Sequence, residues 1–341
     1  HGFEGMGDPV SICWLKRVGG DYKSKEKIKL QALKKKTGNK VAVIGAGPAG
    51  LALANDLALL GHSVTVYEAL PTAGGMLYSG IPAFRLPRTL IQQEIKDITD
   101  LGVELKLNTR IGKEITLQQL KEGNDAVCIT AGCMVPVRLN VPGEDYQGVI
   151  PGLDFMMQVN TGKLKGLRGT VVVIGGGFTA MDCSRTALRL GAEKSIVLYR
   201  RTRNEMLVDE RELKETSLEG VEFQFLVAPV KIISKDGKRV SEIECIKNKL
   251  GEPGADGRKR PVPIEGSNFK IKADWIIPAV SQQSDSSLLP SKLNIKTEKG
   301  MATVDKKSYM TSEKGIFACG DFISGPRNII SVIGEAHKVA N

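Results

Sequence analysis

Two short glycine-rich segments hold the residues whose types and spacing indicate chemistry. The first, GAGPAG, follows an apolar run at residues 40–44, and the second, GGGFTA, follows a similar run at residues 170–174. Glycines between a strand and a helix allow a tight turn and let the backbone approach a pyrophosphate at the helix N-terminus. We therefore predict two dinucleotide-phosphate sites, formed by Gly45, Gly47, Pro48, Ala49 and Gly50 and by Gly175, Gly177, Phe178, Thr179 and Ala180.

The two segments differ at the residue that ends the second strand of each unit. In the first unit this residue is Glu68, a carboxylate that accepts hydrogen bonds from ribose hydroxyls and repels a 2′-phosphate. Aligning the second unit on its glycines places Arg200 there, followed by Arg201. Guanidinium groups bind phosphate bidentately. The first site is therefore expected to bind FAD and the second NADPH, unless the two arginines form an ordinary solvated basic turn.

The elements around each glycine segment repeat in the same order. Apolar strands are expected at residues 40–44 and 63–67, with a helix at 51–60 between them, and the pattern returns between residues 170 and 199. Each unit is about 30 residues long, the size of a β-α-β unit. The sequence therefore predicts an α/β fold with two Rossmann-like domains. Residues 221–273 are expected to form a β-meander, and residues 315–318 a strand before a final helix.

Composition limits the remaining possibilities. The chain has 341 residues, enough for two domains, and a formal net charge of +10. Much of the charge lies at residues 23–40, which suit either a solvated linker or a patch for an acidic partner. The six cysteines form no C-x-x-C pair, so no metal site is expected in this chain. With no nucleic-acid-binding module, signal peptide or membrane-length apolar run, we predict a cytoplasmic location and no nucleic-acid or membrane partner.

Several motifs together resemble the flavoprotein part of the glutamate synthase small (beta) subunit family. Related groups are the NADPH-linked subunits of bifurcating transhydrogenases and the amino-terminal half of dihydropyrimidine dehydrogenase. The similarity extends from Pro9 to the end of the chain. Besides GAGPAG it includes AGGML at residues 73–77, FRLP at 84–87, TAG at 130–132, GGGFTAMD at 175–182, YRRTRNEM at 199–206 and GIFACGD at 315–321.

The resemblance implies a glutathione-reductase-like plan in which the second domain is inserted into the first. The FAD-binding domain would comprise residues 40–145 and 290–341, and the NADPH-binding domain residues 146–289. Residues 1–39 would be an irregular connector from a missing amino-terminal iron–sulfur domain. The resemblance further implies that the flavin is contacted by Glu68, Gly75, Met76, Leu77, Arg85, Gly132, Gly320, Asp321 and the helix N-terminus near Asn328.

Two positions depart from the family pattern. Phe178 stands where the family usually has Asn, and Ser281 stands where it usually has Gly. Residues 8–22 resemble the end of the family's iron–sulfur domain, but the cluster ligands are missing. The resemblance then implies either that the chain is a fragment or that another polypeptide supplies the iron–sulfur clusters.

The predicted function is electron transfer by a flavoprotein oxidoreductase. A hydride would pass to FAD from NADPH, with NADH as the alternative donor. The electrons would continue to iron–sulfur clusters outside this chain. The cofactors carry this chemistry, so no protein residue is predicted to act as a catalytic acid or base. The partner would be a large synthase-type subunit, another iron–sulfur or flavin redox subunit, or ferredoxin.

Three alternatives remain at this point. A thioredoxin reductase type would require a C-x-x-C, and Cys183 has no partner nearby in the sequence. A stand-alone NADPH–ferredoxin reductase would act on a soluble carrier. A structural flavin-binding subunit would have lost its nicotinamide reaction, and Phe178 and Ser281 are the residues that favour it.

Overall fold

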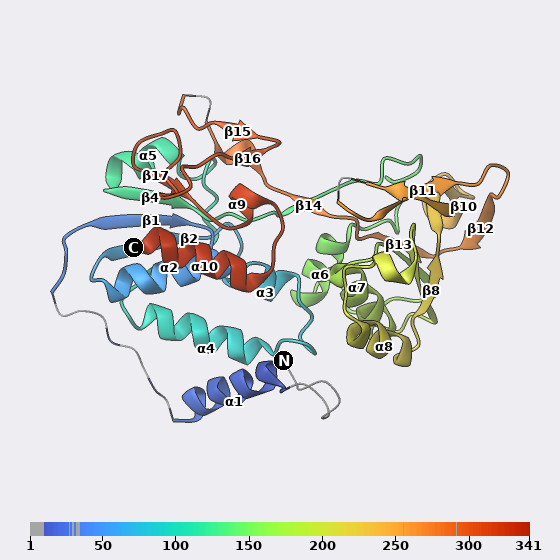
Figure 1. Cartoon of the computed structure of the whole chain (residues 1–341), viewed down its shortest axis with the longest axis horizontal. Coiled ribbons are helices and arrows are strands. Elements are labelled where there is room, and N and C mark those ends of the chain that lie inside the picture. The colour runs from blue at the N-terminus through green and yellow to red at the C-terminus, as the bar shows by residue number, and fades with distance from the viewer. Residues whose placement is uncertain (1–9, 27, 29–30, 32–34, 255, 291) are drawn as a thin grey trace.

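The chain folds into two lobes that lie side by side (Figure 1). The structure is a computed structural model that describes residues 10–26, 28, 31, 35–254, 256–290 and 292–341. Each lobe contains one parallel sheet, and one of the two glycine-rich segments directly follows a strand of each sheet. The predicted irregular connector and the basic stretch at residues 23–40 lie partly outside the described residues.

The first lobe is built on a five-stranded sheet in the order β17-β4-β1-β2-β3, in which every neighbouring pair is parallel. Its strands are β1 (Lys40–Ile44), β2 (Ser63–Tyr67), β3 (Glu104–Lys106), β4 (Ala126–Ile129) and β17 (Ile316–Ala318). Its helices are α2 (Pro48–Leu59), α3 (Met76–Ser79), α4 (Arg88–Thr99), α5 (Leu117–Gly123), α9 (Asp321–Ser324) and α10 (Ile329–Ala340). Because β17 pairs with β4, the chain returns to this sheet after it has completed the second lobe.

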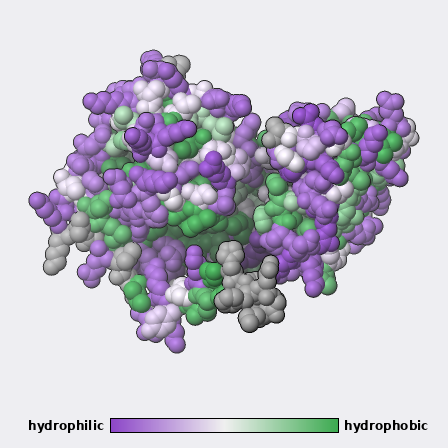
Figure 2. Space-filling view, viewed as in Figure 1, coloured by the Kyte–Doolittle hydropathy of each residue, from purple (hydrophilic) through white to green (hydrophobic). Residues whose placement is uncertain are grey.

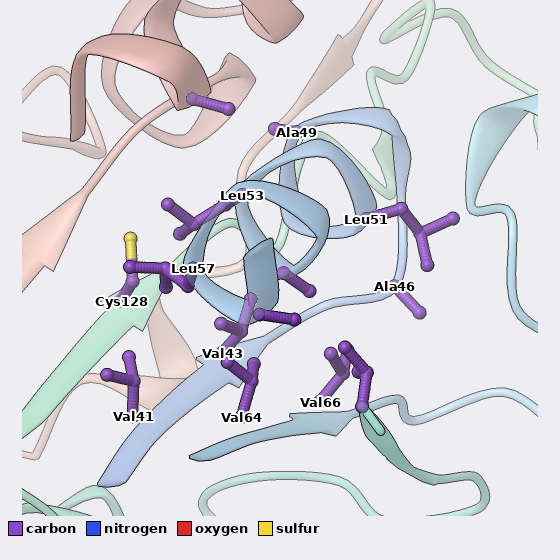
Figure 3. Close-up of a cluster of buried hydrophobic side chains, with 14 of the residues drawn as sticks. Val41, Val43, Ala46, Ala49, Leu51, Leu53, Leu57, Val64, Val66 and Cys128 are labelled. Atoms are coloured by element: carbon purple, nitrogen blue, oxygen red, sulfur yellow. The ribbon is translucent and has the colours of Figure 1, made fainter. Parts of the chain in front are cut away.

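Helix α2 packs against β1 and β2 through small and branched apolar side chains (Figure 3). Val43 and Val66 from the strands and Leu53 from the helix are fully buried in this cluster. Burial of such apolar area is the main favourable term in folding. This packing fixes the start of α2, and therefore the glycine-rich turn before it, against the carboxyl ends of β1 and β2.

The second lobe is built on a four-stranded parallel sheet in the order β13-β6-β7-β8. Its strands are β6 (Thr170–Ile174), β7 (Lys194–Tyr199), β8 (Glu222–Phe225) and β13 (Trp275–Pro278). Its helices are α6 (Gly152–Asn160), α7 (Phe178–Arg189), α8 (Glu210–Leu218) and the 3₁₀ turn η1 (Arg203–Glu205). An antiparallel sheet follows, with β9 (Val227–Ser234), β10 (Val240–Pro253), β11 (Lys259–Pro263) and β12 (Phe269–Lys272). The predicted meander is therefore correct for β9, β10 and β11. It is wrong for β12, which pairs with β10, and for β8, which extends the parallel sheet. A second 3₁₀ turn, η2 (Ser286–Leu288), belongs to the first lobe, because its Leu288 is buried in a core cluster there.

Two segments of the chain run from one lobe to the other. They contain the short strands β5 (Val135–Pro136) and β14 (Gln282–Gln283), which pair antiparallel. Figure 1 shows β14 running between the two lobes. The remaining strands, β15 (Thr297–Glu298) and β16 (Met301–Ala302), form a small hairpin in the first lobe.

The expectation of an irregular amino-terminal arm is wrong for residues 12–25. They form helix α1 (Ile12–Lys25), with apolar residues Ile12, Leu15, Val18 and Tyr22 at helical spacing. Lys23 Nζ lies 3.5 Å from Asp97 of α4, which ties the helix to the first lobe. No helix among the described residues is long and apolar enough to cross a membrane.

Candidate functional site

The first glycine-rich turn meets a second glycine loop at close range. Gly75 has a φ of 51°, and a Cβ built on it would lie 2.7 Å from Gly47 Cα. A side chain at Gly75 would strain the backbone and push against the turn, so this position requires glycine. The two bare backbones leave room for a group that must approach the main chain closely, as a pyrophosphate does.

Glu68 directly follows β2 beside this turn, and backbone amides hold its carboxylate in place. Its Oε2 accepts a hydrogen bond from the Ala46 amide at 2.8 Å, and its Oε1 accepts one from the Leu70 amide at 2.9 Å. Burial raises the pKa of the Glu68 carboxyl, and the backbone donors partly oppose that rise. Because each carboxylate oxygen has two acceptor sites, Glu68 keeps lone pairs for ribose hydroxyls.

A cavity of about 610 Å³, which we call the first cavity, opens at the carboxyl edge of the first sheet. Figure 2 shows hydrophobic residues gathered in the hollow between the two lobes. A largely apolar cavity of this size suits a flavin dinucleotide. The predicted residues that line it are Gly45, Gly47, Pro48, Ala49, Glu68, Gly75, Met76, Leu77, Gly132 and Asp321, together with Gly177, Phe178 and Thr179 from the second unit.

Three residues predicted for this site support the cavity from behind instead of lining it. Gly50 lies within α2, where it packs against the turn. The Gly320 amide donates to Glu335 Oε2 at 2.9 Å. Asn328 caps α10, because its Oδ1 accepts a hydrogen bond from the Ser331 amide at 2.9 Å. This cap orients the N-terminus of α10. Ile329 and Val332, in the first turn of this helix, line the first cavity.

Arg85 is not part of either cavity lining, but it connects the lobes by contacting Asp182 and Phe178, which line the first cavity. Its Nη1 contacts Asp182 Oδ1 of α7 at 2.6 Å, and its Nη2 lies 3.7 Å from Glu212 of α8. Its guanidinium also stacks 5.7 Å from the Phe178 ring centroid. Burial raises the pKa of Asp182 to about 6, although Arg85 opposes that rise. The residue predicted to lie near the flavin therefore forms an ion pair between the lobes.

The second glycine-rich turn borders another cavity of about 690 Å³, which we call the second cavity. Gly175, Gly177 and Thr179 line it, whereas Ala180 is fully buried behind the turn. The remaining predicted residues of this unit, Arg200 and Arg201, also line it. Their surroundings differ, because Arg200 is exposed and Arg201 is buried with its Nε donating to the Lys259 carbonyl at 2.7 Å.

The two cavities adjoin one another. Gly177, Thr179 and Leu207 of the second unit belong to the lining of both cavities, and so does Gln282 of the crossing strand β14. Sequence reasoning did not find Leu207 or Gln282, or the charged residues Arg110, Arg138 and Arg258 that also line the cavities. Gln282 ends a segment that resembles a family motif, whereas the other four residues belong to no motif, and only the tertiary fold brings them to the site.

The residues on both sides fit the expected groups. Glu68, whose carboxylate keeps free acceptor sites, lines the first cavity, and Arg200, Arg201 and Arg258 line the second. Among the described residues, no cluster of His, Cys, Asp and Glu that could hold a metal ion is found.

The fold and its two adjoining nucleotide-type cavities define the class of two-dinucleotide flavoproteins. In agreement, residues 39–339 match the family described as pyridine nucleotide-disulphide oxidoreductase, so the chain belongs to that family. The predicted two-domain α/β fold and the FAD- and NAD(P)H-dependent oxidoreductase class are confirmed. The fold is also that of Mycobacterium tuberculosis FprA in complex with NADPH, with a TM-score of 0.74, 21% identity and coverage of 89% of this chain and 83% of that one.

Two relatives define the resemblance further. The chain is 36% identical to the glutamate synthase [NADPH] small chain of Escherichia coli, over 90% of this chain and 68% of that protein. It is 43% identical to the NADP(+)-dependent formate dehydrogenase subunit beta of Moorella thermoacetica, over 89% of this chain and 43% of that protein. The resemblance to the glutamate synthase small chain family is thus confirmed. The chain nevertheless spans only about half the length of several relatives that it matches.

Proposed function

We propose that the chain passes a hydride from NADPH in the second cavity to FAD in the first. The observation that carries this proposal is the shared wall, in which Gly177, Thr179, Leu207 and Gln282 border both cavities. Nicotinamide and flavin rings in adjoining cavities can meet, and the bound cofactors then supply the redox chemistry. The chain's own residues bind and orient: Glu68 holds the FAD ribose, and the turn at Gly175 holds the NADPH pyrophosphate.

We also propose how the chain is divided and where its electrons go. Residues 40–145 and 290–341 bind FAD and residues 146–289 bind NADPH, which the pairing of β17 with β4 supports. The electrons continue to iron–sulfur clusters of a partner or of another part of the polypeptide, in the cytoplasm. The names of the relatives, "small chain" and "subunit beta", support a partner subunit. Efficient reduction of ferredoxin by the chain alone would favour a stand-alone reductase instead.

The test is anaerobic stopped-flow reduction of the bound flavin. NADPH should bleach the flavin absorbance, and the extracted flavin should be FAD. A chain that retains FAD and binds NADP⁺ without bleaching by NADPH would be a structural flavin-binding subunit, contrary to the proposal.

Gly177 provides a variant aimed at the shared wall. Its φ of −111° is accessible to every residue, and a Cβ built on it meets nothing within 4 Å. A Gly177→Val side chain therefore enters the open space between the cavities without disturbing the fold. It should slow flavin bleaching about a hundredfold, since small misplacements of reacting groups cost that much. Gly123→Val is the matched control, because Gly123 is also open and lies in α5, away from both cavities.

A further inference from the structure

The buried arginine of the basic turn is committed to holding a hairpin. Arg201 is only 7% exposed, and its Nε donates to the Lys259 carbonyl at the start of β11. The neighbouring backbone is held as well, since the Leu226 amide donates to the Arg201 carbonyl at 3.0 Å. Asn248 of β10 donates from Nδ2 to the Arg200 carbonyl at 3.1 Å. The antiparallel hairpin of β10 and β11 is therefore bonded directly to the basic turn.

This hairpin brings another arginine to the second cavity. Arg258 lies just before β11 and lines the cavity together with Arg200. One carboxylate, Asp256, orients it, with Oδ2 at 2.7 Å from Arg258 Nη2 and 3.9 Å from Arg201 Nη2. Asp256 occupies Nε and one Nη2 donor of Arg258, so the Nη1 donors remain for a ligand. The side chain of Arg258 is 31% exposed, which leaves it accessible from the cavity.

The charges of this corner suit a dianion. Arg200, Arg201 and Arg258 contribute three positive charges, and Asp256 contributes one negative charge, which leaves a net +2. Every charged residue that is described in the lining of the second cavity is an arginine. The fourth, Arg138, is paired with two carboxylates, Glu144 and Asp145, and so adds no positive charge. A phosphate monoester carries a charge close to −2 at neutral pH.

We propose that Arg258 is a second ligand of the NADPH 2′-phosphate, together with Arg200, and that Arg201 positions the hairpin that carries Arg258. The nucleotide specificity then depends on the β10–β11 hairpin as well as on the β-α-β unit. This inference rests on the proposed NADPH site.

The test measures binding of two nucleotides that differ only in the 2′-phosphate. Titration calorimetry with 2′,5′-ADP and 5′-AMP needs no flavin reaction. Arg258→Gln should weaken 2′,5′-ADP about tenfold, the value of a charge-assisted hydrogen bond reduced by solvent screening, and leave 5′-AMP within about twofold. Arg260→Gln is the matched control, because Arg260 lies on the same hairpin but does not line the cavity.

Two double variants separate direct from indirect effects. If Arg258 only neutralises Asp256, Asp256→Asn combined with Arg258→Gln will restore wild-type affinity, and the ligand role is overturned; a persistent loss supports it. If Arg201 acts through Arg258, adding Arg258→Gln to Arg201→Gln will weaken 2′,5′-ADP no further. Additive losses would make Arg201 an independent ligand. Arg201→Lys replaces Arg201→Gln in this cycle if the glutamine variant does not fold.

The outcomes also distinguish this inference from the proposal beneath it. Equal binding of 2′,5′-ADP and 5′-AMP by the wild type would overturn the NADPH assignment itself. A wild type that prefers 2′,5′-ADP, with an Arg258→Gln variant that keeps the full preference, would overturn only the role of Arg258.

Discussion

The two β-α-β units have the same plan but place their helices in different surroundings. Helix α2 is almost entirely apolar and packs into the first core, with α10 against it. Helix α7 carries Asp182 and Arg185, both buried, and these pair with Arg85 of the other lobe and with Glu212 of α8. The helix that follows the glycine-rich turn is therefore a core element in the first lobe, and in the second lobe it takes part in a charged contact between the lobes. The glycine-rich turn is common to both, and the helix behind it is adapted to its neighbours.

The packing behind each turn differs too, and Gly50→Ala should show the largest effect. A Cβ built on Gly50 would lie 1.9 Å from the Gly45 carbonyl oxygen and 2.6 Å from Thr130 Oγ1. No small shift relieves a contact with backbone at that distance, so we expect most of the FAD to be lost and the free energy of unfolding to fall by about 3 kcal/mol. The flavin-to-protein absorbance ratio after gel filtration measures the first effect. Full FAD retention would contradict the tight packing of the first turn.

The buried charged contact of α7 predicts a pH dependence of the folding stability. Burial raises the pKa of Asp182 from 3.8 to about 6, so the folded chain holds this proton more tightly than the unfolded chain. That contribution to stability is present below pH 4 and is lost as the pH rises through 6. Asp182→Asn should remove this loss, on the order of 2–3 kcal/mol. Urea unfolding between pH 4.5 and 7 at constant ionic strength measures most of it.

The control for this pH profile is Asp236→Asn. Backbone hydrogen bonds lower the pKa of Asp236 to about 2, so this carboxyl stays ionised in the folded chain throughout the range. Its replacement should leave the slope of unfolding free energy against pH unchanged. Parallel profiles for the wild type and Asp182→Asn would mean that the ion pair with Arg85 keeps Asp182 ionised, and the difference between α2 and α7 would then be only one of charge.

Sequence reasoning reached what neighbouring residues determine. The turns, the strands around them and the contrast between Glu68 and Arg200 follow from short spacings, because a β-α-β unit is built from consecutive residues. The pairing of Arg85 with Asp182, across 97 positions, could not be derived in this way. In the sequence, Arg258 looks like any basic residue in a hairpin turn. It stands 58 positions after Arg200, and only the fold brings the two arginines into the same cavity. The Arg85–Asp182 pair and the position of Arg258 both depend on contacts between segments that are far apart in the sequence.

Ala180→Gly should show the smallest effect and is the direct counterpart of Gly50→Ala. Ala180 stands where the first unit has Gly50, and it is fully buried at the start of α7, so the second turn accommodates the methyl group that the first excludes. Replacing it with glycine adds backbone freedom to a helix and leaves a small void, which together cost about 1 kcal/mol of unfolding free energy. The turn itself keeps its conformation, so NADP⁺ affinity measured by calorimetry should stay within about twofold. A loss of NADP⁺ binding as complete as the loss of FAD in Gly50→Ala would mean that the methyl group helps to hold the second turn. Both turns would then depend on the packing behind them. The first would require that position 50 has no side chain, and the second would require the methyl group of Ala180.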